Sequence, residues 1–229
     1  MIMNISKNIA KFIRKNLFYR QKGVRFGHNC RVGWKVSFEG MNKLTDRVTF
    51  FDSHIGYASY VGDDSVIVKT EIGRYTSIAS GVKTISGLHP TSMFVSTHPC
   101  FYSLQKQSGF TYVGEQLFDE GKYLDEKNGI SIVIGNDVWI GANTIIMPGI
   151  KVSDGAIIAA GSILNQNVEP YGIYGGAPAR LIRYRFSSEQ IEFLLRLKWW
   201  DKDKNWLQEN AHLFDDIDKF IQNIGLIQR

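Results

Sequence analysis

The strongest constraint on the fold is a period of six residues in the second half of the chain. From Ile134 onward, every sixth residue of "IGNDVWIGANTIIMPGIKVSDGAIIAAGSILNQNVE" is aliphatic. A helix would scatter such residues around its circumference, and simple strand alternation has a period of two. The pattern is typical of a solenoid in which each hexapeptide forms one short strand and corner. Stacked coils then bury a core that no single repeat could bury alone.

Small or β-branched residues accompany this pattern two positions before each later aliphatic residue. The aliphatic positions are Ile134, Ile140, Ile146, Val152, Ile158 and Leu164, and the accompanying positions are Val138, Thr144, Ile150, Ala156 and Ser162. We expect the aliphatic residues to point into the coil.

A less regular block with the same period precedes this one. Ile55, Val61 and Ile67 keep the six-residue spacing, and Ile72 and Ile78 resume it after a step of five, which predicts one tighter corner. Earlier still, "VRFGHNCRVGWKVSFEG" alternates apolar and polar residues. That stretch is either an imperfect first coil or an ordinary antiparallel hairpin.

Residues 87–131 interrupt the repeat completely. The segment begins "GLHPTSMFVSTHPCFYS" and carries His89 and His98. Irregular inserts of this length in a compact domain are uncommon and are usually functional or disordered. Because solenoid repeats flank it on both sides, we interpret it as a functional excursion from the solenoid, which spans residues 23–182.

Both ends of the chain are predicted to be helical. In residues 183–229, Ser187 and Gln190 form a capping-box pattern before an apolar run, and further short amphipathic helices follow. We expect these helices to pack on the end of the solenoid and hide its open edge. Residues 1–22 are predicted to form a basic amphipathic helix, which either caps its own fold or lies on an anionic membrane surface.

Composition limits the cellular context and the partners. The 229 residues are 44% hydrophobic and 21% charged, with two cysteines and no zinc-type spacing. No apolar stretch is long enough for a signal peptide or a membrane span, so we expect a cytoplasmic protein, with peripheral contact at the inner membrane face if the N-terminal helix binds lipid. The net charge of +5 favours anionic partners, but no nucleic-acid-binding module is visible, and we expect no nucleic-acid partner.

Three motifs together resemble a known family. The hexapeptides, "GGAPARLI" and "FSSEQIEFLLRLKWWD" cover about residues 50–205 and are similar to hexapeptide-repeat acyltransferases. The match is to the branch of streptogramin and other xenobiotic acetyltransferases and O-acetyltransferases of bacterial surface polysaccharides. The resemblance implies a left-handed parallel β-helix, acetyl-CoA as donor without a catalytic metal, and a homotrimer with active sites between subunits. Handedness rests on the resemblance alone.

The chemistry of acyl transfer to a hydroxyl directs attention to the two histidines. The hydroxyl needs a base, and histidine suits that role near neutral pH. No G-x-S-x-G motif is present and neither cysteine lies in an activating motif, which favours direct transfer in a ternary complex. Position in the family favours His89, whose His-Pro context resembles that of sugar O-acetyltransferases and differs from that of the streptogramin enzymes. His98 is expected to line the acceptor pocket.

The resemblance also implies binding residues along the coils. Asp52 and Ser53 are expected on the acceptor side. The donor is expected to contact Trp139, Ala142, Ala159, Ala160, Gly176, Ala177, Pro178, Arg180 and Arg183. Trp139 as a corner-packing indole and Arg180 as a solvated charge are the competing interpretations.

The sequence therefore predicts an acetyl-CoA-dependent O-acetyltransferase that modifies a sugar hydroxyl of a surface glycan such as lipopolysaccharide or capsule. A streptogramin-type antibiotic acetyltransferase is the alternative within the same class. A non-catalytic solenoid scaffold is the alternative from another class, and the loop histidine and the GGAPA segment argue against it.

Overall fold

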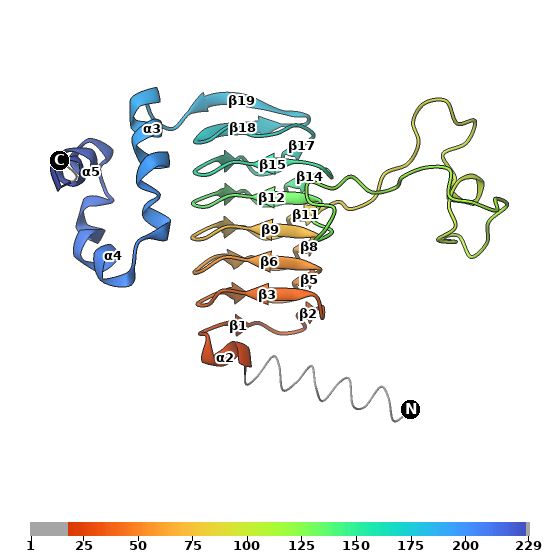
Figure 1. Cartoon of the computed structure of the whole chain (residues 1–229), viewed down its shortest axis with the longest axis horizontal. Coiled ribbons are helices and arrows are strands. Elements are labelled where there is room, and N and C mark those ends of the chain that lie inside the picture. The colour runs from red at the N-terminus through yellow and green to blue at the C-terminus, as the bar shows by residue number, and fades with distance from the viewer. Residues whose placement is uncertain (1–17, 228–229) are drawn as a thin grey trace.

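The computed structural model describes residues 18–227 and shows a parallel β-solenoid with a projecting arm on one side and helices on the other (Figure 1). Its strands form three sheets of eight, six and five members, here called sheets A, B and C. Each coil contributes one strand to each sheet in turn, and strands of successive coils pair in parallel. The predicted solenoid of hexapeptide repeats with helices at its C-terminal side is confirmed.

The strands are short, as the hexapeptide period requires. Sheet A contains, in spatial order, β1 (Arg25–Phe26), β4 (Lys43–Leu44), β7 (Tyr60–Val61), β10 (Ser77–Ile78), β13 (Trp139–Ile140), β16 (Ile157–Ile158), β18 (Gly172–Gly176) and β19 (Ala179–Tyr184). Sheet B contains β17 (Ile163–Leu164), β14 (Ile145–Ile146), β11 (Lys83–Thr84), β8 (Val66–Val68), β5 (Thr49–Phe51) and β2 (Arg31–Val32). Sheet C contains β15 (Lys151–Val152), β12 (Ile132–Ile134), β9 (Thr70–Ile72), β6 (Ser53–Ile55) and β3 (Val36–Phe38).

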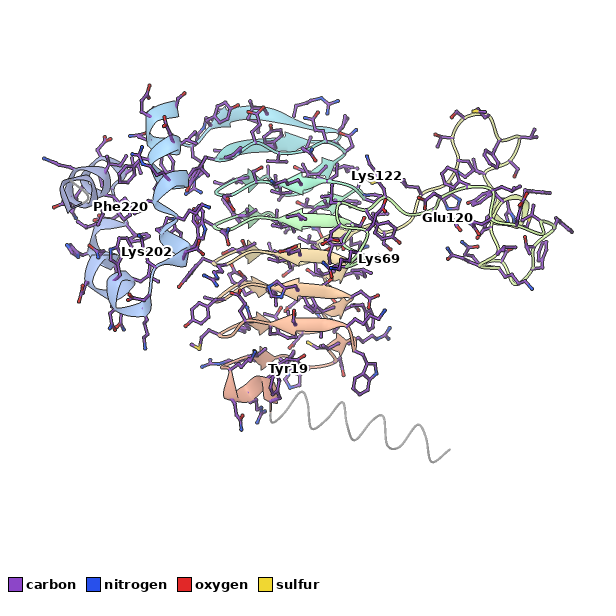
Figure 2. All side chains as sticks on the ribbon, viewed as in Figure 1. Tyr19, Lys69, Glu120, Lys122, Lys202 and Phe220 are labelled. Carbon is purple, nitrogen blue, oxygen red and sulfur yellow. The ribbon has the colours of Figure 1, made fainter. Side chains whose placement is uncertain are left out.

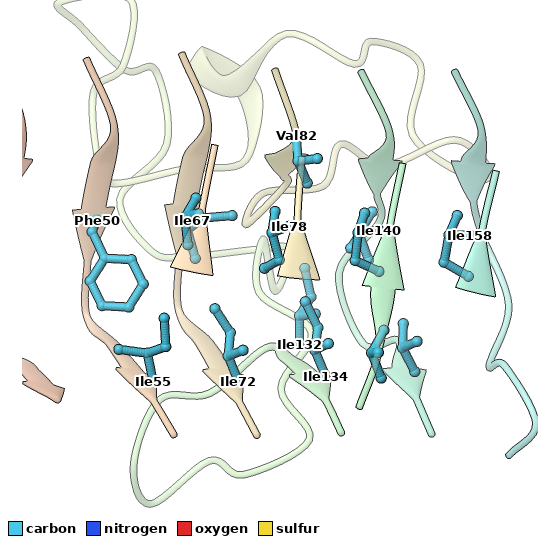
Figure 3. Close-up of a cluster of buried hydrophobic side chains, with 14 of the residues drawn as sticks. Phe50, Ile55, Ile67, Ile72, Ile78, Val82, Ile132, Ile134, Ile140 and Ile158 are labelled. Carbon is cyan, nitrogen blue, oxygen red and sulfur yellow. The ribbon is translucent and has the colours of Figure 1, made fainter. Parts of the chain in front are cut away.

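The periodic aliphatic residues form the core (Figure 3). Equivalent positions stack between coils, so that Ile72 lies in register with Ile55 on one side and Ile134 on the other. All six aliphatic positions from Ile134 to Leu164 are buried, as are the five positions that accompany them. Like residues therefore meet like residues through the stack, and the burial is repeated in every coil.

The corners account for the irregular spacing. Strands β8 and β9 are joined by a single residue, Lys69, whose φ is +50°, which explains the step of five residues. Gly73 lies at a close approach of two coils: a Cβ there would lie 2.6 Å from the backbone of Gly135. Strands β1, β2 and β3 pair in parallel with the next coil, so residues 24–38 form a first coil and not a hairpin.

The two ends of the stack are closed in different ways. At the first coil, Tyr19 in the short helix α2 (Tyr19–Gln21) packs edge-on against Phe38 with ring centroids 4.8 Å apart. At the last coil, β19 turns back and pairs antiparallel with β18. The predicted N-terminal helix falls mainly in residues 1–17, which lie outside the described residues.

The C-terminal helices lie beside the solenoid, which corrects the expectation that they cover its end. They are α3 (Ser188–Leu197), η3 (Trp199–Asp201), α4 (Lys204–Asn210), η4 (Ala211–Leu213) and α5 (Ile217–Ile227). Helix α3 begins with the predicted capping box of Ser187 and Gln190. The helices run along the corner between sheets C and A, where side chains of the solenoid contact them (Figure 1).

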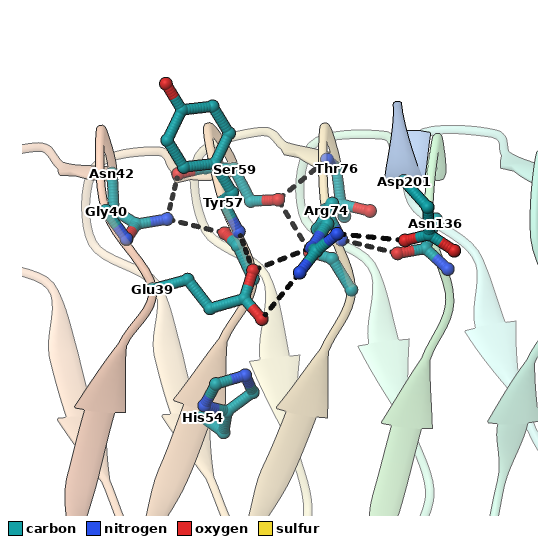
Figure 4. A network of polar contacts seen from close by, with 12 residues as sticks. Glu39, Gly40, Asn42, His54, Tyr57, Ser59, Arg74, Thr76, Asn136 and Asp201 are labelled. Carbon is teal, nitrogen blue, oxygen red and sulfur yellow. Dashed lines mark hydrogen bonds and ion pairs between the residues drawn. The ribbon is translucent and has the colours of Figure 1, made fainter. Parts of the chain in front are cut away.

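Aromatic and ionic contacts fix the helices to this corner. The Trp199 ring packs on the Tyr75 ring at 5.0 Å. The Arg74 guanidinium bonds Asp201 at 2.9 Å and Glu39 of the first coil at 2.8 Å (Figure 4). Burial opposes ionisation of Glu39, but hydrogen bonds from Arg74 and the Tyr57 N–H, with the charge of Arg74, bring its pKa below the ordinary value. Within residues 18–227, no helix is both long and apolar enough to cross a membrane.

Candidate active site

The arm, residues 87–131, leaves the solenoid between β11 and β12 and holds its own small core. The buried Tyr102 ring meets the rings of Phe94 and Phe118 at 6.0 and 5.5 Å. Glu120 accepts hydrogen bonds from Ser103 Oγ and Gln116 Nε2. An irregular loop can hold a side chain in one position when its own residues pack in this way.

His89 is held by two contacts on one ring nitrogen. Its Nδ1 lies 2.9 Å from the Thr97 carbonyl oxygen and 2.7 Å from the Tyr102 hydroxyl. We assign the proton to Nδ1, because the Thr97 carbonyl oxygen can only accept; the Tyr102 hydroxyl then accepts from the same N–H. The lone pair is then on Nε2, on an exposed imidazole. This is the tautomer that a general base needs.

His98 has a different local role. Its Nδ1 lies 2.8 Å from the Cys100 thiol and accepts from the Cys100 backbone N–H at 3.3 Å, which caps the 3₁₀ helix η2 (Pro99–Phe101). The nitrogen that binds these groups carries a lone pair and not a proton. His98 is therefore engaged in holding the turn, while His89 has an unoccupied basic nitrogen.

Most of the predicted donor-binding residues lie along the corner between sheets A and B. Ala142 follows β13, and Ala159 and Ala160 follow β16 one coil later. The Gly161 N–H donates to the Ala142 carbonyl, so these corners stack directly. At the end of the column, Gly176, Ala177 and Pro178 make the exposed turn between β18 and β19. The structure thus brings this set together.

The predicted aromatic and cationic donor residues lie on the same sheet. Trp139, on β13, is 54% exposed on the outer face of sheet A, so it does not pack a corner. Arg180 and Arg183 are exposed on β19, and their described hydrogen bonds go to Ala179, Asn165 and Tyr184. Neither guanidinium forms an ion pair with a described carboxylate, so both charges remain open to an anion.

The predicted acceptor-side residues lie at the corner between sheets B and C. Asp52 is a corner residue with φ of +46°, and it lines a cavity of about 460 Å³ with Trp34 and His54. Ser53 also lines the cavity, but it is buried, and its hydroxyl donates to the Phe51 carbonyl at 2.6 Å. Ser53 therefore supports the corner.

A Ser–His contact that the sequence analysis missed lies in the same cavity. Ser37 Oγ is 2.6 Å from His54 Nδ1. The two residues are register partners on β3 and β6, which places them on neighbouring coils. No sequence signal marked them, because they lie 17 positions apart in two strands of the less regular block.

Within one chain, the histidine does not meet the donor and acceptor residues. The hydrogen bonds of His89 go to Thr97 and Tyr102, both in the arm, and the arm projects away from the coils (Figure 1). In Figure 2, Glu120 of the arm lies farther from the coils than Lys122 at the base of the arm. One chain therefore carries the parts of a site on separate surfaces.

The family comparison matches the strongest repeat. The model described as bacterial transferase hexapeptide (six repeats) matches residues 131–166. This segment begins at the return of the chain from the arm and covers β12 to β17.

Named acetyltransferases are similar over most of the chain. A probable macrolide acetyltransferase of Lysinibacillus sphaericus is 40% identical over 77% of this chain and 88% of its own length. A chloramphenicol acetyltransferase of Klebsiella aerogenes is 37% identical over 69% of each chain. The galactoside O-acetyltransferase of Escherichia coli K12 is 30% identical over 57% of this chain and 53% of its own.

Proposed function

The chain belongs to the hexapeptide-repeat acetyltransferases, whose fold is a left-handed parallel β-helix, and we propose that it is an acetyl-CoA-dependent O-acetyltransferase with His89 as its general base. The single observation that carries this proposal is the pair of contacts on His89 Nδ1. They hold the ring and leave Nε2 with its lone pair toward solvent.

The reaction is a direct transfer. His89 Nε2 takes the proton of the acceptor hydroxyl while that oxygen attacks the thioester carbonyl. As the tetrahedral intermediate collapses, the carbon–sulfur bond breaks, and the imidazolium returns the proton to the departing thiolate. The Thr97 carbonyl accepts the Nδ1–H bond throughout and stabilises the imidazolium while it is charged.

The donor lies along the corner between sheets A and B. The small side chains of Ala142 and Ala160 leave room for an extended arm beside the coils. Arg180 and Arg183, exposed near the last turn, supply positive charge for the donor's phosphates. Trp139 provides an exposed ring on the same sheet.

A second copy completes the site. The arm ends in apolar side chains that its own chain does not cover, and Met93 and Val95 are fully exposed. Exposed apolar residues on a projecting arm favour docking against another molecule. In a homotrimer, His89 of one subunit then faces the donor and acceptor surfaces of a neighbouring subunit. This would explain why His89 lies apart from both surfaces within one chain.

Two acceptor classes are in competition. A sugar hydroxyl of a surface glycan is favoured by the His89–Pro90 context, which resembles that of sugar O-acetyltransferases. An antibiotic hydroxyl is favoured by the relatives, since those named for macrolides and chloramphenicol have higher identity to this chain than the galactoside enzyme.

A transfer assay with a panel of acceptors tests the function. The purified protein is incubated with acetyl-CoA and either nucleotide sugars, oligosaccharides, chloramphenicol, a macrolide or a streptogramin, and release of coenzyme A thiol is measured. Acceptor-dependent thiol release supports the proposal, and the acceptor that gives it decides between the two classes.

Coenzyme A binding tests the donor surface separately. We expect calorimetry to show binding that weakens in Arg180→Ala, with Arg20→Ala on helix α2 as the matched control. Absence of any coenzyme A binding would support the scaffold alternative.

A further inference from the structure

A cavity of about 570 Å³ lies between the solenoid and the C-terminal helices, at the corner of sheets C and A. This is the side of the solenoid opposite the arm: Phe220, which lines the cavity, and Glu120 of the arm lie on opposite sides in Figure 2. The cavity shares no residue with the donor or acceptor surfaces described above. It therefore requires its own explanation.

The helical wall of the cavity is aromatic. The Phe214 ring lies 5.2 Å from the Trp199 ring and 4.9 Å from the Phe220 ring, and all three line the cavity. Aromatic faces attract cations, Trp most strongly, and the attraction grows when the cation is removed from water. A wall of three such rings favours a ligand that is both apolar and positively charged.

The charged groups of the cavity are mostly carboxylates. Asp215 and Asp216, just before α5, and Asp218, in its first turn, line it. These carboxylates have few described contacts. The Asp215 carboxylate lies 3.3 Å from the Lys219 ammonium, and the Asp218 carboxylate accepts a hydrogen bond from the Gln190 side-chain amide at 2.7 Å.

The Asp216 carboxylate is engaged in the same limited way, because among the described residues it accepts a hydrogen bond only from the Lys219 backbone N–H, at 2.9 Å. Deeper in the cavity, Asp137 and Arg185 form an ion pair at 3.1 Å. With Arg185 the only basic side chain among the described lining residues, the three outer carboxylates make the cavity negative.

The floor carries a buried polar group without a partner. Tyr171 is 1% exposed, lines the cavity, and its hydroxyl has no hydrogen-bond partner among residues 18–227. Buried hydroxyls in native proteins are almost always hydrogen-bonded. Burial, with Asp137 nearby, raises the pKa of this phenol, so it remains a neutral hydroxyl that can accept a hydrogen bond.

We propose that this cavity binds a small organic ammonium compound, with its carbon skeleton against the three aromatic rings and its charged nitrogen between the outer carboxylates and Tyr171. The ammonium N–H groups donate to the carboxylates and to the Tyr171 oxygen. The carboxylates disfavour an anion such as the nucleotide part of the donor. The proposal does not depend on the function of the arm.

Calorimetry and tryptophan fluorescence with three matched probes test it on the full chain. Benzylammonium supplies a ring, a charge and N–H donors, benzyltrimethylammonium supplies the ring and charge alone, and benzoate supplies the ring with the opposite charge. We expect saturable binding of both cations that weakens with added salt, and no saturable binding of benzoate. Fluorescence should change because Trp199 is in the wall.

Two variants separate the parts of the site. Replacing Asp215, Asp216 and Asp218 together by Asn should weaken both cations at least fivefold, while Glu209→Gln on α4, outside the cavity, should leave binding unchanged. Asn also caps a helix well, so α5 should persist, and a thermal melt checks this. Tyr171→Phe should weaken benzylammonium more than benzyltrimethylammonium, which cannot donate to the hydroxyl.

Three results would overturn the proposal. They are benzoate binding as tightly as the cations, no saturation by either cation at millimolar concentrations, and a folded triple variant that binds like the parent. If the triple variant fails to fold, the two-probe comparison in Tyr171→Phe decides, and equal loss for both probes counts against the site.

Discussion

Replacing His89 by alanine removes the one nitrogen on which the proposed mechanism depends. Nδ1 is already bound to Thr97 and Tyr102, so Nε2 alone can take the acceptor proton. Positioned acid–base catalysis contributes about 10²–10⁴ in rate, which corresponds to roughly 3–5 kcal/mol of transition-state stabilisation. We expect kcat to fall by that factor. Coenzyme A affinity should change little, because the donor corner lies on the solenoid.

The assay is thiol release from acetyl-CoA under saturating acceptor, with coenzyme A binding measured in parallel. His98→Ala is the matched control, since His98 caps η2 with its Nδ1. It should raise the acceptor KM with a smaller effect on kcat. The rising limb of kcat/KM with pH should disappear in the His89 variant only. Near-normal turnover by His89→Ala, with collapse in His98→Ala, would refute the assignment.

Three further outcomes follow from the geometry. Tyr102→Phe removes one of the two hydrogen-bond contacts on the His89 ring, and a contact of this kind contributes about 0.5–1.5 kcal/mol. We therefore expect kcat to fall about 2- to 12-fold, while coenzyme A affinity stays unchanged. An unchanged kcat and pH profile would exclude a positioning role for Tyr102. Gly73→Ala places a methyl group 2.6 Å from the next coil's backbone. Urea unfolding should show that the free energy of unfolding falls by about 1–3 kcal/mol. An unchanged free energy of unfolding would mean that the coils can move apart easily at this point. The pKa of Glu39 is lowered by Arg74, so the stabilising effect of its carboxylate is present above its unfolded pKa and is lost as the pH falls through its folded pKa. The difference in melting temperature between the parent and Glu39→Gln should therefore disappear in acid. A difference that stays constant with pH would contradict this.

The solenoid could be predicted because its information is local and repeated. Each aliphatic position reports a contact with the equivalent position one coil away, so the period alone identifies the core, the stacking of coils and one tighter corner between Ile67 and Ile72, which the structure places at Lys69. The capping box at Ser187 was equally visible, because both partners lie within one helical turn. The first coil was ambiguous in sequence, since alternation over short strands does not distinguish parallel stacking from a hairpin.

The candidate site was predicted only in part. The interruption contains two histidines, and only the family resemblance of its His-Pro context favoured His89 over His98; the contact of His89 with Tyr102 could not be predicted at all. The arm has no period, and its contacts join residues at unrelated spacings through side-chain packing. Likewise, the contact of Ser37 with His54 follows from coil register and from no motif.

What the sequence determined by itself was the period, and through it the coil, its core and the place where the coil is interrupted. The tertiary structure decided where the non-repeating parts lie. Helices α3–α5 could have covered the end of the stack, but they lie along its side because Tyr75 and Arg74 there meet Trp199 and Asp201. A contact that is repeated in every coil produces a periodic pattern in the sequence. A contact that is made once leaves no such pattern, because it depends on two surfaces that meet only after the chain has folded.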